Sequence, residues 1–395
     1  MRQFTVSRLP ELLFGEGRLF ELPAVLRRMG VSAVALVTGG RSFRDSENRE
    51  RLLAALREAG IRAAEFSVGG EPSPEEVDGI AAELKGSPGP RVDGVAAVGG
   101  GSAIDAAKAV SALLTMEGSV ADYLEGVGSR VPPGTRLPLV AAPTTAGTGT
   151  EATKNAVISR VGEGGFKKSL RHDNFIPDAA ILDPLLTLSC PPEVTAASGL
   201  DAVTQLLEAF TSPRGSPFTD AMALDALRIA GDAFPRVCRD GGDREARAGM
   251  AYAAYVSGVC LAHAGLGVVH GIASPLGGMF HIPHGLICGT LVAEASRFTI
   301  GRAMRIDDPS GGSVLKKYAR AGRALSGREA GSDFGDAALL INTLEALVER
   351  ARLPRLGALG LTEEDARRVA DKTAAPNHPV PLSPDDVFDI LRRRI

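Results

Sequence analysis

The 395-residue sequence lacks features that would point to whole classes of partner. Its formal net charge is −3, so no face is expected to carry the basic stripe that nucleic-acid binding requires. No apolar run approaches the ~20 residues of a membrane-spanning helix, and no N-terminal segment shows the charged-then-apolar pattern of a signal peptide. We therefore expect neither nucleic acid nor a membrane as a partner.

Cysteine is also scarce, and its distribution indicates reduced thiols. The four cysteines lie far apart and form no C-x-x-C pair: Cys190, Cys238, Cys260 and Cys288. Mostly buried, reduced thiols are typical of a cytoplasmic protein, which is the location that the sequence predicts. The chain also has no internal repeat and no low-complexity tract.

The length of the chain and its hydrophobic periodicity predict two domains. The first half alternates strands at residues 32–37, 61–68, 95–98 and 137–142 with helices at residues 47–58, 74–85 and 103–110. Strands separated by helices imply right-handed crossovers and a mostly parallel sheet. Later segments have helical periodicity, at residues 192–210, 217–238, 244–262, 285–298, 314–325, 334–351, 362–373 and 384–394. We expect an α/β domain at residues 1–188 and an all-helical domain at residues 189–395.

The glycine-rich turn after the strand at residues 95–98 is the first candidate binding site. Its three consecutive glycines, residues 99–101, allow a ligand to approach the backbone closely. Ser102 is the predicted N-cap of the next helix, with Asp105 in the first turn. The unpaired N–H groups and the dipole of that helix favour an anion such as a pyrophosphate. An ordinary tight turn is the alternative, because the run matches neither G-x-G-x-x-G nor a Walker loop.

Two further turns rich in glycine or threonine also follow predicted strands. They comprise residues 38–42 (TGGRS) and residues 143–151 (PTTAGTGTE). Ligands of parallel sheets bind beyond the carboxyl ends of the strands, so all three turns are expected to converge on one cleft. The second turn formally fits a relaxed dinucleotide pattern, but the strand-like residues 155–160 follow it. We interpret it as a threonine-lined loop near a cofactor.

The helical half holds the candidates for chemistry. Asp201 and Gln205 lie four residues apart, and hence on one face of a helix. Four of the six histidines are clustered in the sequence: His263, His270, His281 and His284. Two imidazoles with a carboxylate are a usual set for a divalent metal with a position open for substrate. Hydrogen-bonded core or surface histidines are the alternative, because the spacing from His270 to His284 matches no short metal motif.

Taken in order, these motifs resemble the iron-containing (group III) alcohol dehydrogenase family over essentially the whole chain. The matching pieces are Gly99-Gly100-Gly101-Ser102 with Asp105 and Lys108, residues 143–151, Asp183-Pro184, Gly199-x-Asp201-Ala202, Gly265-Leu266-Gly267-x-x-His270 and Pro283-His284-Gly285. The resemblance implies the dehydroquinate synthase-like fold, with a dinucleotide-binding domain followed by a helical metal and substrate domain. It also implies an NAD(P)-dependent alcohol dehydrogenase or aldehyde reductase acting on a small alcohol, aldehyde or ketone, and a homo-oligomer (a dimer or larger).

The resemblance implies a metal held by one Asp and three His, which carries over to Asp201, position 205, His270 and His284. Gln205 departs from the pattern, because the family usually has His there and an amide oxygen is a weaker ligand for iron or zinc. Three alternatives are open: Gln205 is a weak ligand, water or His281 completes the shell, or no metal binds. A bound Fe²⁺ or Zn²⁺ would act as a Lewis acid. Without it, His270, His281 or His284 would have to donate the proton.

Cofactor contacts are expected from the three turns and, by resemblance, from one lysine. The candidates are Gly39, Gly40, Ser42, Gly99, Gly100, Gly101, Ser102, Asp105, Thr144, Thr145, Thr148, Gly149 and Lys167. NAD-preferring relatives commonly carry Asp just after the first strand, where this chain has residues 39–42 (GGRS). That turn would accommodate the extra phosphate of NADP, so NADP(H) is favoured over NAD(H). Arg41 pointing into solvent is the alternative.

Two other enzyme classes remain as alternatives. A metal-independent reductase of the maleylacetate type would keep its activity after exhaustive chelation. A dehydroquinate-synthase-like lyase would handle a phosphorylated sugar acid, but residues 265–289 contain no Lys or Arg to bind it. A non-catalytic binding protein has the least support, since it would need neither the glycine turns nor the histidine cluster.

Overall fold

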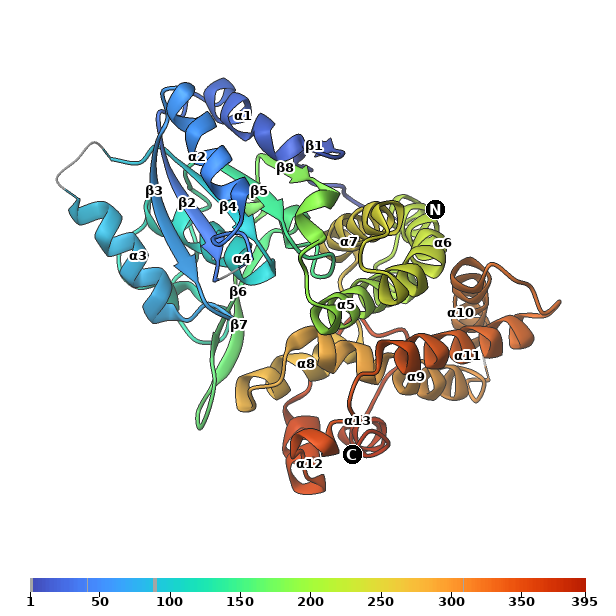
Figure 1. Cartoon of the computed structure of the whole chain (residues 1–395). Coiled ribbons are helices and arrows are strands. Elements are labelled where there is room, and N and C mark those ends of the chain that lie inside the picture. The colour runs from blue at the N-terminus through green and yellow to red at the C-terminus, as the bar shows by residue number, and fades with distance from the viewer. Residues whose placement is uncertain (1–2, 41, 88–90, 308) are drawn as a thin grey trace. The chain divides into compact units, whose positions relative to one another are not determined.

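The structure is a computed structural model that describes residues 3–40, 42–87, 91–307 and 309–395. The chain folds into two compact units (Figure 1). The α/β unit comprises Ser7–Thr145 and Gly149–Cys190. The helical unit comprises Pro191–Ile395, Ala146–Thr148 and the described N-terminal residues up to Val6.

The α/β unit is built around a parallel sheet. Its strands are β1 (Glu11–Phe14), β2 (Ala33–Gly39), β3 (Arg62–Val68), β4 (Gly94–Gly99), β5 (Leu139–Pro143), β6 (Asn155–Arg160), β7 (Phe166–Arg171) and β8 (Ala179–Leu182). Its helices are α1 (Leu22–Arg28), α2 (Glu47–Glu58), α3 (Pro74–Gly86) and α4 (Gly101–Leu113). Among the described residues, six strands pair in parallel in the order β1-β8-β5-β4-β2-β3, and β6 pairs with β7 antiparallel. The predicted α/β domain with a mostly parallel sheet is confirmed.

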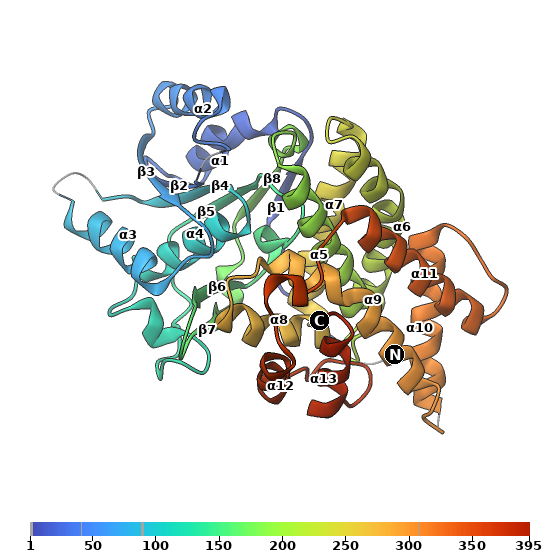
Figure 2. The same cartoon turned by 60° about the horizontal axis from the view of Figure 1, so that its bottom comes forward.

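Helices cover both faces of this sheet, which explains why its strands are continuous apolar runs. Successive side chains of a strand point to opposite faces. Val34 and Leu36 of β2 therefore pack with α1 and α2 on one face, whereas Ala35 and Val37 pack with α3 and α4 on the other. Figure 2 shows the two helix pairs on opposite sides of the sheet. With both faces covered, no position along the central strands favours a polar residue.

The helix after the triple glycine begins earlier than the sequence predicts. Ser102 is not its N-cap; Gly100 takes that position, and α4 starts at Gly101. The Gly100 carbonyl accepts hydrogen bonds from the N–H groups of Ala103 and Ile104, at 3.1 and 3.2 Å. The prediction was wrong because glycine also serves as an N-cap. Serine is preferred to glycine there by only ~0.3 kcal/mol, which is too little to fix the first residue of the helix.

The second unit is helical, as predicted. Its helices are α5 (Pro192–Thr211), α6 (Pro217–Arg239), α7 (Arg244–Ala264), α8 (Val268–Met279), α9 (His284–Ala303), α10 (Pro309–Ser326), α11 (Asp333–Ala351), α12 (Glu363–Lys372) and α13 (Pro384–Arg392). The sequence did not predict α8, because Gly271, Pro275 and two further glycines lower its intrinsic helix propensity. Burial compensates, since Ile272 and Leu276 belong to a core shared with α9, α12 and α13.

A sharp bend separates α7 from α8. Gly265 is the C-cap that follows α7, and its φ of 70° favours glycine. A Cβ on Gly265 would lie 2.4 Å from Asn377 Nδ2. Among the described residues, no single helix is long and apolar enough to cross a membrane. The α7–α8 pair passes that test only when the two are joined, and they are bent by 97°.

Candidate functional site

The glycine-rich turns of the α/β unit meet at one edge of the sheet. β2, β4 and β5 are neighbours, and Gly99 at the end of β4 pairs with Pro143 at the end of β5. A Cβ on Gly99 would lie 2.8 Å from the backbone nitrogen of Gly39 and 2.6 Å from Ala103 Cβ, so no larger residue fits. Bare backbone beside the first N–H groups of α4 is a surface suited to a pyrophosphate.

The turn after β2 is open to solvent. Gly39 and Gly40 are half-buried and Ser42 is exposed. Arg41, on which the predicted cofactor preference partly depends, lies outside the described residues. A Cβ on Gly39 would approach no atom closer than 3.9 Å, so the turn has room for a larger group.

The threonine-rich turn after β5 is tied to the triple glycine. The Thr144 N–H donates to the Gly99 carbonyl at 2.9 Å, and a Cβ on Gly100 would lie 3.5 Å from the Thr145 side chain. Gly149 has a left-handed backbone (φ 59°), which favours glycine. Thr148 belongs to the helical unit. The assignment of these residues as cofactor contacts stays a prediction.

Asp105 faces a buried cluster inside the α/β unit. Lys108 is 0% exposed, and its Nζ donates to Thr150 Oγ1 and Thr153 Oγ1, each at 2.8 Å, and to the Asn155 carbonyl at 2.9 Å. The Thr150 hydroxyl in turn donates to Asp105. Burial lowers the pKa of Lys108 to about 8 and raises the pKa of Asp105. The contacts of Asp105 in this structure are therefore with the residues that anchor the threonine-rich turn.

Lys167 is engaged by a carboxylate. It lies on β7 and forms an ion pair with Glu71, which also accepts a hydrogen bond from Ser159 Oγ at 2.7 Å. A cofactor phosphate would have to share or displace Glu71, so the role of Lys167 stays a prediction.

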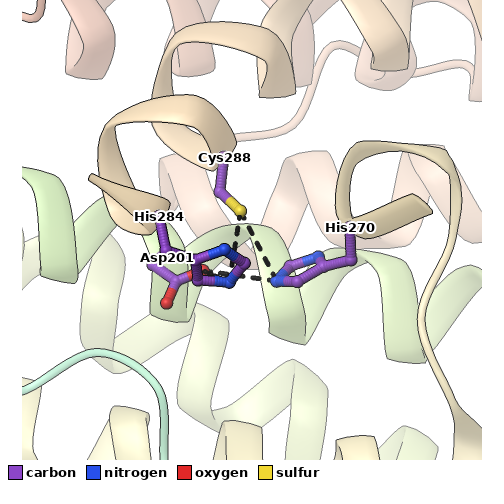
Figure 3. A group of neighbouring side chains, drawn as sticks. All are labelled: Asp201, His270, His284 and Cys288. Atoms are coloured by element: carbon purple, nitrogen blue, oxygen red, sulfur yellow. Dashed lines mark hydrogen bonds and ion pairs between the residues drawn. The ribbon is translucent and has the colours of Figure 1, made fainter. Parts of the chain in front are cut away.

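Side chains from three helices converge in the helical unit (Figure 3). Asp201 comes from α5, His270 from α8, and His284 and Cys288 from α9, and one potential ligand atom of each lies within 4.8 Å of the others. Asp201 Oδ1 is 3.3 Å from His270 Nε2 and 3.8 Å from His284 Nε2. The structure thus brings together three of the four predicted metal ligands.

Cys288 was missed as a member of this cluster. Its Sγ lies 3.7 Å from Nε2 of both His270 and His284. Sequence reasoning treated it as one of several buried thiols. The available signal was its spacing of four residues from His284, which places the two side chains on one face of a helix.

The remaining predicted residues have the following contacts. Gln205 is 2% exposed, and its Nε2 donates to the Gly147 carbonyl at 3.1 Å, whereas its Oε1 accepts no hydrogen bond from the described residues. His281 is exposed and lies outside the four-residue cluster. His263 Nδ1 lies 2.7 Å from the carbonyl of Val259, within α7. The structure does not bring His281 to the position where it was predicted to complete the shell.

Glu208 contacts His270 through Nδ1, the ring nitrogen that does not face Asp201, and the sequence analysis did not identify it. Its Oε2 lies 2.7 Å from His270 Nδ1, and its Oε1 accepts from the Val269 N–H at 2.7 Å. Burial alone would raise the pKa of Glu208, but its hydrogen bond with His270 holds that pKa below the usual value. By accepting from Nδ1–H, Glu208 orients the His270 ring so that Nε2 is turned toward Asp201 Oδ1, 3.3 Å away. The signal in the sequence was the spacing 201, 205, 208, which follows one helix face.

Replacing Glu208 with glutamine is expected to lower the metal affinity of the protein about 10- to 100-fold, because the imidazole loses its fixed orientation and part of its basicity. Equilibrium dialysis against buffered Zn²⁺ measures this, with circular dichroism to show that the helices persist. Glu345→Gln, at an exposed carboxylate paired with Arg297, is the matched control. Equal zinc affinity of the Glu208 variant and the wild type would refute a positioning role.

The donor set fits a divalent metal. A carboxylate oxygen and two imidazole nitrogens are ligands for zinc and iron, and donors of a tetrahedral site with ~2.0 Å bonds lie about 3.3 Å apart. The observed separations from Asp201 Oδ1 to His270 Nε2 and His284 Nε2 are 3.3 and 3.8 Å. Burial raises the pKa of Asp201, but the two histidines outweigh burial and hold its pKa below the usual value. Asp201 is thus kept ionised, as a metal ligand must be.

Comparison with known families agrees with this arrangement. Residues 10–184 match the model of the family described as "Iron-containing alcohol dehydrogenase". Residues 195–395 match "Fe-containing alcohol dehydrogenase family, C-terminal". The chain belongs to the iron-containing alcohol dehydrogenase family. The predicted membership of this family, and with it an alcohol dehydrogenase or aldehyde reductase, is confirmed.

Individual members of the family match along most of their length. Long-chain-alcohol dehydrogenase 1 of Geobacillus thermodenitrificans is 33% identical over 383 residues, covering 94% of this chain and 92% of the relative. The NAD-dependent methanol dehydrogenase of Bacillus methanolicus is 33% identical over 332 residues, covering 80% and 84%. The crystal structure of a 1,3-propanediol oxidoreductase superposes with a TM-score of 0.89 at 28% identity over 100% of both chains. The predicted fold of the iron-containing alcohol dehydrogenases is confirmed.

Proposed function

We propose that this iron-containing alcohol dehydrogenase performs metal-assisted, reversible hydride transfer between a nicotinamide cofactor and a small alcohol, aldehyde or ketone. The observation that supports the metal is the convergence of Asp201, His270 and His284 from three helices, with Asp201 buried and both histidines half-buried. Residues 1–188 would bind the dinucleotide, and residues 189–395 would bind the metal and the substrate.

The residues of the helical unit have distinct tasks in this reaction. Asp201, His270 and His284 would hold a divalent metal that supplies Lewis-acid polarisation of the substrate oxygen. Glu208 fixes the His270 ring by accepting from Nδ1, so that Nε2 stays turned toward Asp201. Asp201 is 1% exposed, and the exclusion of water around it strengthens every charge interaction in the cluster.

The α/β unit supplies orientation rather than chemistry. The N–H groups at the start of α4 and the bare backbone of Gly99 would bind the pyrophosphate, while the nicotinamide carries the hydride. NADP(H) is the proposed cofactor, with NAD(H) as the alternative. The absence of a carboxylate from residues 39–42 supports this preference, since a carboxylate would repel the additional phosphate.

We also propose a homo-oligomer, a dimer or larger, in the cytoplasm. β1 is an edge strand of the sheet, and its Leu12 and Phe14 are each 39% exposed. An edge strand with exposed apolar side chains is a template for pairing with another chain. Cys238, Cys260 and Cys288 are free thiols, which supports a reducing compartment.

Removal of the metal tests the proposed function. Dialysis against a strong chelator is expected to lower the rate of aldehyde reduction at least ~100-fold, because a Lewis acid lowers the activation barrier by several kcal/mol. Added Zn²⁺ or Fe²⁺ should restore the activity, and circular dichroism before and after should be unchanged. Parallel assays with NADPH and NADH measure the cofactor preference, and a higher kcat/KM with NADH would contradict the proposed NADP(H).

A metal-independent reductase is the second candidate, and Gln205 in place of a histidine is the observation that favours it. It predicts full activity in the chelated protein with no metal detected by elemental analysis. That outcome, measured with an aldehyde and a keto-acid panel, would overturn the metal-assisted mechanism and leave the hydride-transfer class intact.

A further inference from the structure

The starting observation is a thiol inside the candidate metal centre. Cys288 lies one helical turn after His284 on α9 and is 0% exposed. Its Sγ is equidistant from His270 Nε2 and His284 Nε2, at 3.7 Å from each. In Figure 3 the sulfur lies over the two imidazole rings and points toward them.

The spacing of the donors is that of a tetrahedral site. Metal–nitrogen bonds of about 2.0 Å and metal–sulfur bonds of about 2.3 Å place neighbouring donors about 3.3 to 3.6 Å apart. The four separations measured within the cluster are 3.3, 3.7, 3.7 and 3.8 Å. These four of the six donor–donor separations are close to tetrahedral values, and the donor atoms of the other two pairs lie within 4.8 Å of each other.

Gln205 competes poorly for the same coordination position. Its amide nitrogen donates to the Gly147 carbonyl at 3.1 Å, which leaves only its buried Oε1, an atom that accepts no hydrogen bond from the described residues, to ligate a metal. Its oxygen is neutral, and an amide carbonyl is a weaker donor to zinc or iron than a thiolate. The ligands also differ in charge, because a Cys288 thiolate would be a second anionic ligand beside Asp201, whereas Gln205 is neutral and would leave Asp201 as the one anionic ligand of the dication.

We propose that Cys288 is the fourth protein ligand of the metal in place of Gln205, which makes this a thiolate centre that selects zinc over iron. This inference rests on the proposed metal-assisted function. On binding, the Cys288 thiol gives its proton to the solvent, and a sulfur lone pair bonds to the cation. The thiolate is a soft ligand, and soft ligands favour zinc over the harder divalent iron.

Cobalt substitution tests the ligand set directly. The apoprotein loaded with Co²⁺ is expected to show a near-ultraviolet thiolate-to-cobalt charge-transfer band, which oxygen and nitrogen ligands alone do not produce. Cys288→Ser is expected to lose the band and at least ~10-fold in metal affinity. Gln205→Leu is expected to keep the band. Cys260→Ser, at a buried cysteine on α7 whose Sγ lies 3.6 Å from the Thr219 carbonyl, is the matched control and should also keep it.

The outcomes separate this inference from the proposed function. A wild type that binds one Co²⁺ without the band, or a Cys288→Ser variant that retains it, would overturn the thiolate ligand and leave the metal-assisted mechanism standing. A wild type that binds no metal would overturn both. In anaerobic competition, the ratio of bound Zn²⁺ to bound Fe²⁺ should be higher in the wild type than in Cys288→Ser, and equal ratios would contradict the zinc selectivity.

Discussion

Asp201→Asn is expected to lower kcat/KM for aldehyde reduction at least ~100-fold and to leave the purified protein without stoichiometric metal. The substitution keeps the shape of the side chain but replaces a buried carboxylate by a neutral amide. Both imidazoles of the cluster lie within 3.8 Å of Asp201 Oδ1, so this oxygen is central to the proposed site. The loss should therefore be larger than that expected for Glu208→Gln, which acts through one imidazole only.

The location of the defect distinguishes loss of metal from unfolding. Asp201 belongs to the helical unit, and the proposed pyrophosphate site belongs to the α/β unit, so NADPH affinity measured by fluorescence should be unchanged. Elemental analysis gives the metal content, and circular dichroism reports the helices. Asp225→Asn, at an exposed carboxylate that pairs with Arg228, is the control and should behave as the wild type. An Asp201 variant with full metal content and activity would refute the proposed site.

Local signals in the sequence were sufficient for much of the fold. The helix predicted at residues 47–58 coincides with α2 (Glu47–Glu58), because its charged and apolar positions repeat with a helical period and a serine precedes it. The strand-like residues 155–160 coincide with β6 (Asn155–Arg160). By contrast, β1 has four residues and an alternation too short to recognise, and its pairing with β8 joins segments far apart in the chain.

The site shows a similar division between local and long-range information. His284 and Cys288 are four residues apart, and Asp201 and Glu208 share a helix face, so each pair was accessible to spacing arguments. Spacing arguments could not show which histidines lie beside Asp201. His270 is on α8, which has weak helix propensity, and the position of α8 is set by burial against other helices. His281 illustrates the limit: it is three residues from His284, yet its side chain is exposed in the segment between α8 and α9.

Lys108→Met is expected to lower the free energy of unfolding of the α/β unit by about 3 to 5 kcal/mol, the usual cost of removing one partner from a buried ion pair. Lys108 is fully buried beside Asp105, at 3.9 Å, and its ammonium donates to three oxygens. Without it, the Asp105 carboxylate loses the cation at 3.9 Å, and the Thr150 and Thr153 hydroxyls lose their common donor. Hydrogen exchange at the amides of α4, together with urea denaturation, measures the loss.

The charge of the cluster provides the control for this prediction. If the uncompensated carboxylate dominates the cost, Lys108→Met combined with Asp105→Asn should be more stable than the sum of the two single effects predicts, with a coupling of about 0.5 to 3 kcal/mol. Lys154→Met removes a more exposed lysine that pairs with Asp173 and should cost less than ~1 kcal/mol.

Because Lys108 also anchors Thr150, the Lys108→Met variant should bind NADPH more weakly than the wild type, in proportion to its loss of stability. A Lys108 variant as stable as the Lys154 variant would show that the buried cluster contributes nothing to the threonine-rich turn.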